Sequence, residues 1–412
     1  MSNKENATNM TQSTKRELKP RLRFPEFQDA GEWEEKRLRK IAKSVSDKAL
    51  EKNNDNILTL SGEHGLVLQS DYFGKKIAGD NVSRYIRIAL NDFVYNDRTT
   101  KSSTYGSIKR LSKYKSGIVS PIYKCFRFGF GENPVFWDWY FESGFHEPQL
   151  HGLVNEGARA GRFNISIEKF LSTLVWHPGG AEQKKIADCL SSIDDLITAQ
   201  TQKLDTLKTH KKGLMQQLFP AEGGTLPKLR FPEFQDAGEW EEKRMEDVAP
   251  LQRGFDLPSD QIIQGSIPVV YSNGIQNFHN KRMAIAPGLV TGRSGTIGKI
   301  HFIEEGDYWP HNTSLWVTSF KGNFPKFIYY LYNAIGMNRF SSGSGVPTLN
   351  RNYVHAFQAS LPPSVGEQQK IANCFSSLDD LITAQTQKLD TLKTHKKGMM
   401  QQLFPAMEEV SS

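Results

Sequence analysis

The chain has 412 residues, of which 38% are hydrophobic, and this length suffices for two or three domains with substantial cores. Its net charge of +7 favours a polyanionic partner, although a mild basic excess is weak evidence on its own. No run approaches the ~18 consecutive apolar residues of a membrane span, and residues 1–20 hold no apolar signal segment, so we expect a soluble, cytoplasmic protein without a membrane segment.

The cysteines are few and far apart. Cys125, Cys189 and Cys374 are an odd number and form no CxxC pair, which argues against a disulfide framework and against a cysteine-based zinc site. We expect reduced, structural thiols and no metal site.

The chain begins with a polar segment. Residues 1–18 are rich in Asn, Ser, Thr, Lys and Glu and cannot bury enough apolar surface to order themselves. We therefore predict a flexible tail over residues 1–19, and a second short tail over residues 406–412.

Two pairs of internal repeats organise the rest of the chain. Residues 20–38 recur as residues 227–245 with 17 of 19 positions identical, and residues 182–220 recur as residues 367–405 with 34 of 39 identical. We call these repeat A and repeat B. The blocks between them, residues 39–181 and residues 246–366, look largely unlike each other. This arrangement predicts a frame that does the same job twice around two blocks with individual tasks.

Each block is predicted to be an α+β domain. Strand-like runs occupy residues 117–127 and residues 266–271, and a helix is expected around residues 324–335. The predicted order is as follows: first globular domain 20–181, first long helix 182–220, second globular domain 221–366, second long helix 367–405.

Repeat B has the periodicity of a coiled coil. Its apolar residues are spaced alternately four and three apart, which predicts a helix roughly 55 Å long in each copy, ended by Pro220 or Pro405. The predicted apolar seam consists of Ile186, Leu190, Ile193, Ile197, Leu204, Leu207, Leu214, Leu218, Ile371, Phe375, Leu378, Ile382, Leu389, Leu392, Met399 and Leu403.

The two long helices are predicted to pair with each other in antiparallel orientation. A compact second block can leave one helix and enter the next most easily when those two ends are neighbours. A pseudo-twofold axis would then place the two domains at opposite ends of the pair. Polar residues on the seam would help to set its register: Gln200, Gln385, Lys211 and Lys396. A helix of a bundle inside an ordinary domain remains the alternative.

Three segments imitate catalytic motifs without satisfying them. The stretch from His146 to His151 has one residue too many for HExxH and contains a proline. Residues 292–299 (GRSGTIGK) have five residues between the outer glycines instead of the four of a Walker A loop, and Ile300 replaces the required hydroxyl. Residues 133–136 (NPVF) lack the second proline of an adenine methyltransferase loop. No matching carboxylate cluster for a nuclease metal occurs in both blocks.

The chain as a whole resembles the specificity subunits of type I restriction-modification systems, over about residues 20–405. The resemblance is carried by RFPEF…W in both copies of repeat A and by the EQ-KIA start and LDTLK…GLMQQLFP end of repeat B. Sequence motifs that resemble those of the family also occur inside the blocks, at residues 95–98, 117–123, 161–165, 254–258, 292–299, 312–315, 347–350 and 361–363.

The resemblance implies a non-catalytic DNA-reading subunit. It implies two target-recognition domains that read the halves of a bipartite, asymmetric sequence on double-stranded DNA, with long helices that set the spacer. Two modification subunits would use S-adenosylmethionine to methylate adenine, and restriction subunits would use ATP and Mg to translocate and cleave DNA, so this chain would hold no cofactor. A coiled-coil scaffold with protein-binding end domains, or a self-sufficient DNA enzyme, remains as an alternative.

The candidate DNA-contacting residues are polar and basic residues on predicted loops. In the first block they are Asn96, Arg98, Lys101, Ser102, Ser103, Tyr105, Lys109, Arg110, Arg159 and Arg162. In the second block they are Arg253, Arg293, Ser294, Lys299 and Arg351. We expect Asn164 and Asn350 to be turn or cap residues, and Trp33 and Trp240 to pack in a core or a subunit contact rather than stack on bases.

Overall fold

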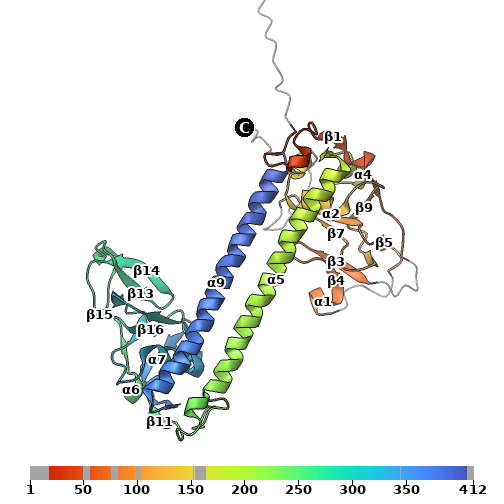
Figure 1. Ribbon diagram of the computed structural model, residues 1–412. Helices are drawn as coiled ribbons and strands as arrows, with labels where there is room; N and C mark the ends of the chain where they lie inside the picture. The colour runs from red at the N-terminus through yellow and green to blue at the C-terminus, as the bar shows by residue number, and fades with distance from the viewer. Residues whose placement is uncertain are drawn as a thin grey trace, which may run out of the picture. The chain divides into compact units, whose positions relative to one another are not determined.

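The computed structural model divides into two units. Unit 1 contains residues 1–199 and 390–412, and unit 2 contains residues 200–389. The residues that the structure describes are 18–49, 56–75, 82–98, 104–151, 153, 164–343 and 345–405. The predicted tails therefore lie almost entirely outside the described residues. Each long helix begins in one unit and ends in the other (Figure 1).

Unit 1 is built on three small sheets with the strand orders β4-β3-β8-β5, β2-β9-β6-β7 and β1-β10. Its strands are β1 (Glu34–Arg37), β2 (Ala42–Ser44), β3 (Ile57–Ser61), β4 (Gly65–Leu68), β5 (Ile86–Ala89), β6 (Phe93–Asn96), β7 (Ser107–Arg110), β8 (Ser116–Val119), β9 (Lys124–Phe128) and β10 (Leu174–His177). Its short helices are α1 (Gln69–Phe73), α2 (Pro134–Glu142), α3 (Glu147–His151) and α4 (Ile167–Leu171).

Unit 2 repeats this topology. Its sheets have the orders β14-β13-β18-β15, β12-β19-β16-β17 and β11-β22, with an added β20-β21 pair. Its strands are β11 (Glu241–Arg244), β12 (Leu251–Arg253), β13 (Ile267–Tyr271), β14 (Gly274–His279), β15 (Ala284–Ile285), β16 (Gly288–Gly292), β17 (Ile300–Ile303), β18 (Asp307–Pro310), β19 (Ser314–Val317), β20 (Ser341–Ser342), β21 (Thr348–Leu349) and β22 (Gln358–Leu361). Its short helices are α6 (Met245–Val248), α7 (Pro325–Ile335) and α8 (Arg351–Ala356).

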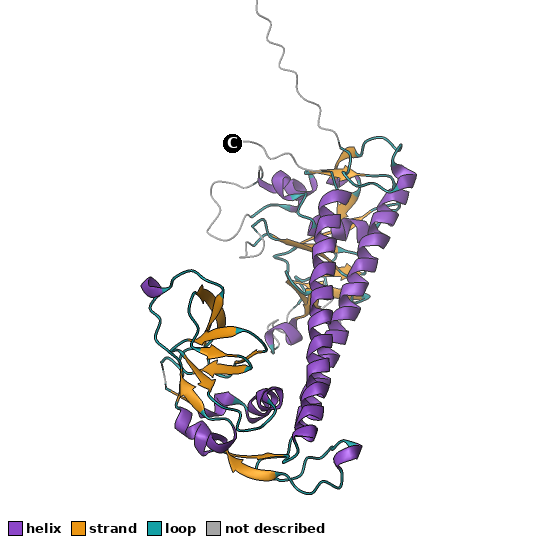
Figure 2. Ribbon diagram, turned by 60° about the vertical axis from the view of Figure 1, so that its left-hand side comes forward, coloured by secondary structure: helices purple, strands orange, loops and turns teal. Residues whose placement is uncertain are grey.

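The two dissimilar blocks therefore share one fold. Each combines helices and strands, as Figure 2 shows, which is the α+β class predicted for each. Each sheet of unit 1 has a counterpart in unit 2 with the same strand order. In the sheet β4-β3-β8-β5, strand β8 is parallel to β3, and in its counterpart β14-β13-β18-β15, strand β18 is parallel to β13. The predicted strand at residues 266–271 and helix at residues 324–335 are confirmed as β13 and α7.

One sequence prediction needs correction. The strand-like run at residues 117–127 is two strands, β8 and β9, which belong to different sheets. Pro121 has no N–H for a ladder bond, and the backbone turns there, with the amide of Tyr123 donating to the carbonyl of Ser120 at 3.1 Å.

Repeat A holds the start of repeat B in each unit. The Arg23 guanidinium donates to both carboxylate oxygens of Glu182, at 2.8 and 2.7 Å, and Arg230 donates in the same way to Glu367, at 2.7 Å for both bonds. All four side chains are almost fully buried. These hydrogen bonds to the carboxylates raise the pKa of each arginine above its usual value. The two repeats are thus complementary halves of one interface, formed twice.

The long helices α5 (Gly180–Leu218) and α9 (Val365–Leu403) run antiparallel, as predicted. In unit 1, Asp194 of α5 meets Lys396 of α9, and in unit 2 Lys211 meets Asp379, so later residues of one helix pair with earlier residues of the other. Gln385 donates to the carbonyl of Gln200 at 3.3 Å. Every predicted seam residue is buried or half-buried.

The end of each long helix completes an aromatic cluster. In unit 1, Phe404 packs against Trp33 and Phe136, with ring centroids 6.0 and 5.8 Å away. In unit 2, Phe219 packs in the same way against Trp240 and Phe327, at 6.2 and 5.7 Å. Both tryptophans are therefore core residues, as expected.

Backbone hydrogen bonds between repeat A and the end of repeat B also recur in the two units. The amide of Leu22 donates to the carbonyl of Gln402 at 2.9 Å, and the amide of Leu229 donates to that of Gln217 at the same distance. In unit 2 residues 218–228 connect the two residues of this contact, Gln217 of α5 and Leu229 in the loop that follows. In unit 1 the contact joins the two ends of the described chain, where Pro20 also forms a β-bridge with Pro405.

The aromatic cluster predicts a large stability difference between two phenylalanines of unit 1. Replacing the fully buried Phe136 by Ala removes the ring between Trp33 and Phe404 and should lower the free energy of unfolding by about 3–5 kcal/mol. Phe130, whose side chain is fully exposed, is the matched control and should cost little when replaced by Ala. Denaturant titrations of both variants measure the difference, and equal losses would contradict this assignment of the core.

Candidate nucleic-acid interface

The loop between β16 and β17, residues 293–299, is held in unit 2 by two neighbouring segments. The Arg293 amide donates to the carbonyl of Thr313 at 2.8 Å, and its carbonyl accepts from the amide of Leu349 at 2.8 Å. Ser294 forms a β-bridge with Thr348. We call residues 293–299 the reading loop of unit 2, after the DNA contact that the sequence predicts for Arg293, Ser294 and Lys299. Its base is fixed to the sheet on both sides.

Glycines are required for the path of this loop. A Cβ atom at Gly292 would lie 1.8 Å from the carbonyl oxygen of Thr296, and one at Gly298 would lie 2.3 Å from the side-chain oxygen of Asn338. Gly298 also has a φ of +91°, which favours glycine. The loop is therefore a tight, defined backbone structure that carries its polar side chains on a rigid base.

Arg253 and Arg293 are linked indirectly, through Asp256 and Asn312. Arg253 at the end of β12 donates to the Asp256 carboxylate at 2.8 Å, and the Asn312 amide donates to the same oxygen. Arg293 in turn donates to the carbonyl of Asn312 at 3.4 Å. The hydrogen bond from Asn312 and the charge of Arg253 hold the pKa of Asp256 below its usual value. The cluster combines two arginines with one ionised carboxylate.

The other predicted residues of the second block are exposed. Lys299 ends the reading loop, where its carbonyl accepts from the Thr291 hydroxyl at 2.9 Å, and Arg351 begins α8. Asn350 caps α8 by accepting from the amide of Asn352 at 3.0 Å, which confirms its expected role. The sheet order thus brings Arg253, Arg293 and Ser294 together, with Arg351 two residues after the neighbouring β21.

Unit 1 has the corresponding loop between β6 and β7. Arg98 follows β6 as Arg293 follows β16, and the amide of Arg98 donates to the side chain of Asn96 at 3.3 Å. Tyr105 precedes β7, and its carbonyl accepts from the Tyr95 hydroxyl at 2.9 Å. Five predicted residues of this block lie outside the described residues: Lys101, Ser102, Ser103, Arg159 and Arg162.

Two predicted residues of unit 1 are paired within the domain. Lys109 forms an ion pair with Glu142 of α2, and Arg110 forms one with Asp138, at 3.0 Å. Burial raises the pKa of Asp138 even though Arg110 is beside it. These contacts give both basic side chains a role in packing β7 against α2, and their contact with DNA stays a prediction. Asn164, with a φ of 52°, has the left-handed backbone of a turn residue, as expected.

The structure adds the β13–β14 turn to the candidate site. Ser272 of this turn lies beside the reading loop, since a Cβ at Gly295 would be 3.8 Å from the Ser272 hydroxyl oxygen. Nearby, the rings of Tyr271 and His311 are 4.1 Å apart, and burial lowers the pKa of His311. The Asn273-Gly274 pair is a recognised hairpin signal, so the sequence could have identified this turn. It could not have shown that the turn lies beside the reading loop.

The near-motifs have structural roles. Asn133 caps α2 by accepting from the amides of Val135 and Phe136, at 2.9 and 3.1 Å. The GRSGTIGK segment leads from one strand into another rather than into a helix. His146 is buried, and burial lowers its pKa to about 3.

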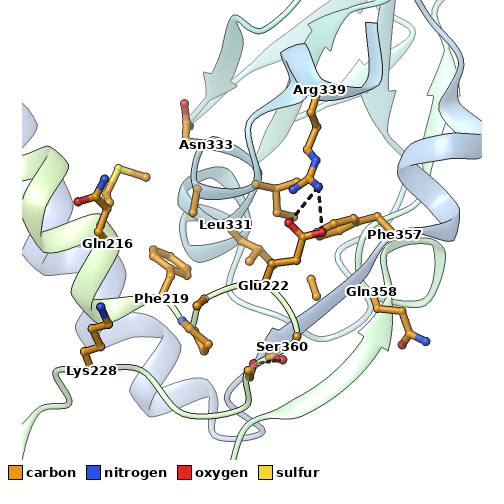
Figure 3. Close-up of a pocket in the computed structure, with 18 of the residues that line it drawn as sticks. Gln216, Phe219, Glu222, Lys228, Leu331, Asn333, Arg339, Phe357, Gln358 and Ser360 are labelled. Carbon is orange, nitrogen blue, oxygen red and sulfur yellow. Dashed lines mark hydrogen bonds and ion pairs between the residues drawn. The ribbon is translucent and has the colours of Figure 1, made fainter.

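A pocket of about 560 Å³ lies elsewhere in unit 2, between the end of α5, the following linker and α7. Figure 3 shows Arg339 and Glu222 joined across it, at 2.9 and 3.0 Å. Phe219, Leu331 and Phe357 form part of its apolar wall. Its lining includes none of the five predicted residues of the second block.

The described residues contain neither a metal-binding cluster nor a membrane-spanning helix. No group of three or more His, Cys, Asp or Glu side chains there could hold a metal ion. No helix among them combines the length and apolar character needed to cross a membrane.

The chain is similar to known proteins in sequence and in fold. Residues 237–394 match the family model of the type I restriction modification DNA specificity domain. The S subunit of a type I restriction-modification system from M. genitalium aligns over 95% of this chain and 100% of its own, with a TM-score of 0.62 and 14% identity. A chain from a structure of complex assembly and conformational transition in the type I R-M system aligns over 91% and 98%, with a TM-score of 0.53 and 14% identity. Residues 237–394 therefore form a type I restriction modification DNA specificity domain, and the chain as a whole has the fold of a type I S subunit.

Proposed function

We propose that each unit reads one half of a bipartite, asymmetric DNA target. The observation that carries this proposal is the placement of two different loops at the same position of one repeated fold, after β6 in unit 1 and after β16 in unit 2. An identical frame around both supports a shared task, and different loop sequences support different specificities.

The side chains at these loops suit the reading of base edges and phosphates. Arginine can bind the O6 and N7 atoms of guanine with two hydrogen bonds, and each loop begins with an arginine close to its strand, Arg98 two residues after β6 and Arg293 one residue after β16. Lys299 suits a phosphate contact, and the +7 charge of the chain favours association with DNA. Asp256 favours selectivity, because its carboxylate can accept from the amino group of cytosine while it would repel a misplaced phosphate.

The catalytic steps are proposed to reside in other subunits. Members of this family generally provide specificity rather than catalysis, and we infer that two modification subunits supply S-adenosylmethionine-dependent methylation. Restriction subunits would supply the ATP- and Mg-dependent steps, and the assembly would work in the cytoplasm. A direct test compares binding of the chain to random duplex DNA, with and without modification subunits. The isolated chain should transfer no methyl group, and methylation by it alone would refute this division of labour.

The first prediction concerns the block between the repeats. Exchanging residues 246–366 for the corresponding block of a relative should change only one half of the methylated sequence, because the reading loop of unit 2 lies in this block. The reciprocal exchange of residues 39–181 is the matched control and should change the other half. A change in both halves, or in neither, on a methylation-site map would show that the units do not read independently.

The second prediction concerns Arg293. Its replacement by Ala should weaken binding to the specific target by about 1–3 kcal/mol if the guanidinium contacts a base. A phosphate contact would weaken all sequences alike and reduce the salt dependence by about one unit. Arg282→Ala, at an exposed arginine paired with Asp307, is the control. Titrations at several salt concentrations separate these outcomes, and unchanged binding would remove Arg293 from the interface.

The third prediction concerns the helices as a ruler. Inserting four residues, about one helical turn, into both α5 and α9 should lengthen the pair by about 6 Å, or about 1–2 base pairs of unread spacer. The insertion also rotates the following part by about 40°, so some loss of affinity should accompany the shift. A methylation-site map measures the spacer. Retained activity at the original spacer would show that the helices do not set it.

A further inference from the structure

Three elements meet at Lys211 in unit 2. Its ammonium group on α5 lies 2.5 Å from a carboxylate oxygen of Asp379 on α9 and 5.4 Å from the ring centre of Tyr330 on α7. The Tyr330 hydroxyl donates to the other carboxylate oxygen of Asp379 at 2.8 Å. Tyr330 itself is almost fully buried. One lysine thus contacts the partner helix and the recognition domain at once.

Unit 1 contains the same junction with a different aromatic residue. The ammonium group of Lys396 on α9 lies 2.5 Å from a carboxylate oxygen of Asp194 on α5 and 4.4 Å from the ring centre of Trp139 on α2. The Trp139 indole donates to the hydroxyl of Ser191 on α5 at 3.3 Å. We call Lys211 and Lys396 the junction lysines.

The aromatic partner is retained although the blocks differ. The lysines and aspartates are equivalent positions of repeat B, whereas Trp139 and Tyr330 belong to the dissimilar blocks. Each is the sixth residue of its helix, α2 or α7, which both begin with proline. A lysine ammonium is attracted to the face of either ring, so both side chains satisfy the same requirement.

The helices that carry these rings connect the junctions to the reading loops. In unit 2, α7 packs against β16 and β17, the strands that flank the reading loop. In unit 1, α2 packs against β7, which follows the corresponding loop. The start of each helix is also fixed to repeat B, because Gln183 accepts from the amide of Asn133 at 3.0 Å and Gln368 from that of Phe324 at 2.8 Å. Each helix is therefore fastened at two points.

Lysine is a costly choice for stability at these positions. Both junction lysines lie on the predicted seam with only about a fifth of the side chain exposed, and an apolar residue would pack there without loss of hydration. Polar seam residues in coiled coils instead select one register among several. The geometry favours a role in alignment over a role in stability.

We propose that Lys211 and Lys396 are positioning residues, which fix each recognition domain on the helix pair in one setting, so that the complex accepts its two half-sites at one spacing only. This inference rests on the proposed function of the two units as half-site readers. The lysines act through α7 and α2 and touch no DNA in this proposal.

The test is methylation by the assembled complex of duplexes with the native spacer and with spacers one base pair shorter and longer. Replacing both junction lysines by Met should lower the preference for the native spacer by about tenfold, a size expected for residues coupled in one network. The control replaces Lys208 and Lys393, which are exposed on the same helices at equivalent positions, by Met. It removes the same charge and should leave the preference unchanged.

Two further measurements separate positioning from stability. Met suits a coiled-coil seam, so the thermal midpoint of the junction variant should stay equal or rise while the spacer preference falls. Replacement by Arg, which keeps the charge and the aromatic contact, should restore most of the preference. An unchanged preference in the Met variant would overturn the proposal, as would an equal loss of methylation at all spacers. A wild-type complex without any bipartite preference would refute the proposed function itself.

Discussion

The buried ion pair between repeat A and the first turn of a long helix is the contact on which the rest of the structure depends. Its two copies, Arg23 with Glu182 and Arg230 with Glu367, leave almost no side-chain surface exposed. Removing one partner of such a pair leaves an uncompensated buried charge, which costs about 3–5 kcal/mol. The pair fixes the start of the helix, and the helix then places the aromatic cluster and the seam.

This dependence explains which parts of the sequence are duplicated. Repeat A supplies an arginine and a tryptophan, and repeat B supplies a glutamate at one end and a phenylalanine at the other. Each of these side chains contacts another part of the duplicated frame, so a change in one would disturb the others. The loops after β6 and β16 face no such constraint and can differ between the units. Divergence is thus confined to the blocks between the repeats, where it changes the loops after β6 and β16 and leaves the sheet topology the same.

Much of the architecture could be predicted because its signals are local or repeated. The seam of repeat B predicted the long antiparallel helices, which begin two residues earlier than expected. The common fold of the two blocks was not predicted, because strands accept many apolar side chains and only scattered positions, such as Phe136 and Phe327, match. Residues 117–127 form two strands because the chain turns at Pro121. The sequence does not show that the strands on either side of this turn pair with different partners, β8 with β3 and β9 with β6.

The candidate site was predicted in part for the same reason. Arg253 and Arg293 were selected separately as basic loop residues, but β12 and β16 flank β19 in the sheet, so that Arg253 bonds Asp256 and Arg293 bonds Asn312, which itself bonds Asp256. No local pattern reveals such a pairing. The pairing of Lys109 and Arg110 with α2 likewise depends on where that helix packs.

The placement of Phe404 between Trp33 and Phe136 has a consequence for the order in which the chain folds during synthesis. The ribosome completes unit 2 first, since residues 200–389 are continuous and their aromatic cluster closes without the C-terminus. Unit 1 is synthesised earlier, yet its cluster lacks a ring until residue 404 has been made. Contacts that span almost the whole chain form slowly, because a large loop must close before they are gained. We therefore expect unit 1, although it is synthesised earlier, to be the last part of the molecule to mature.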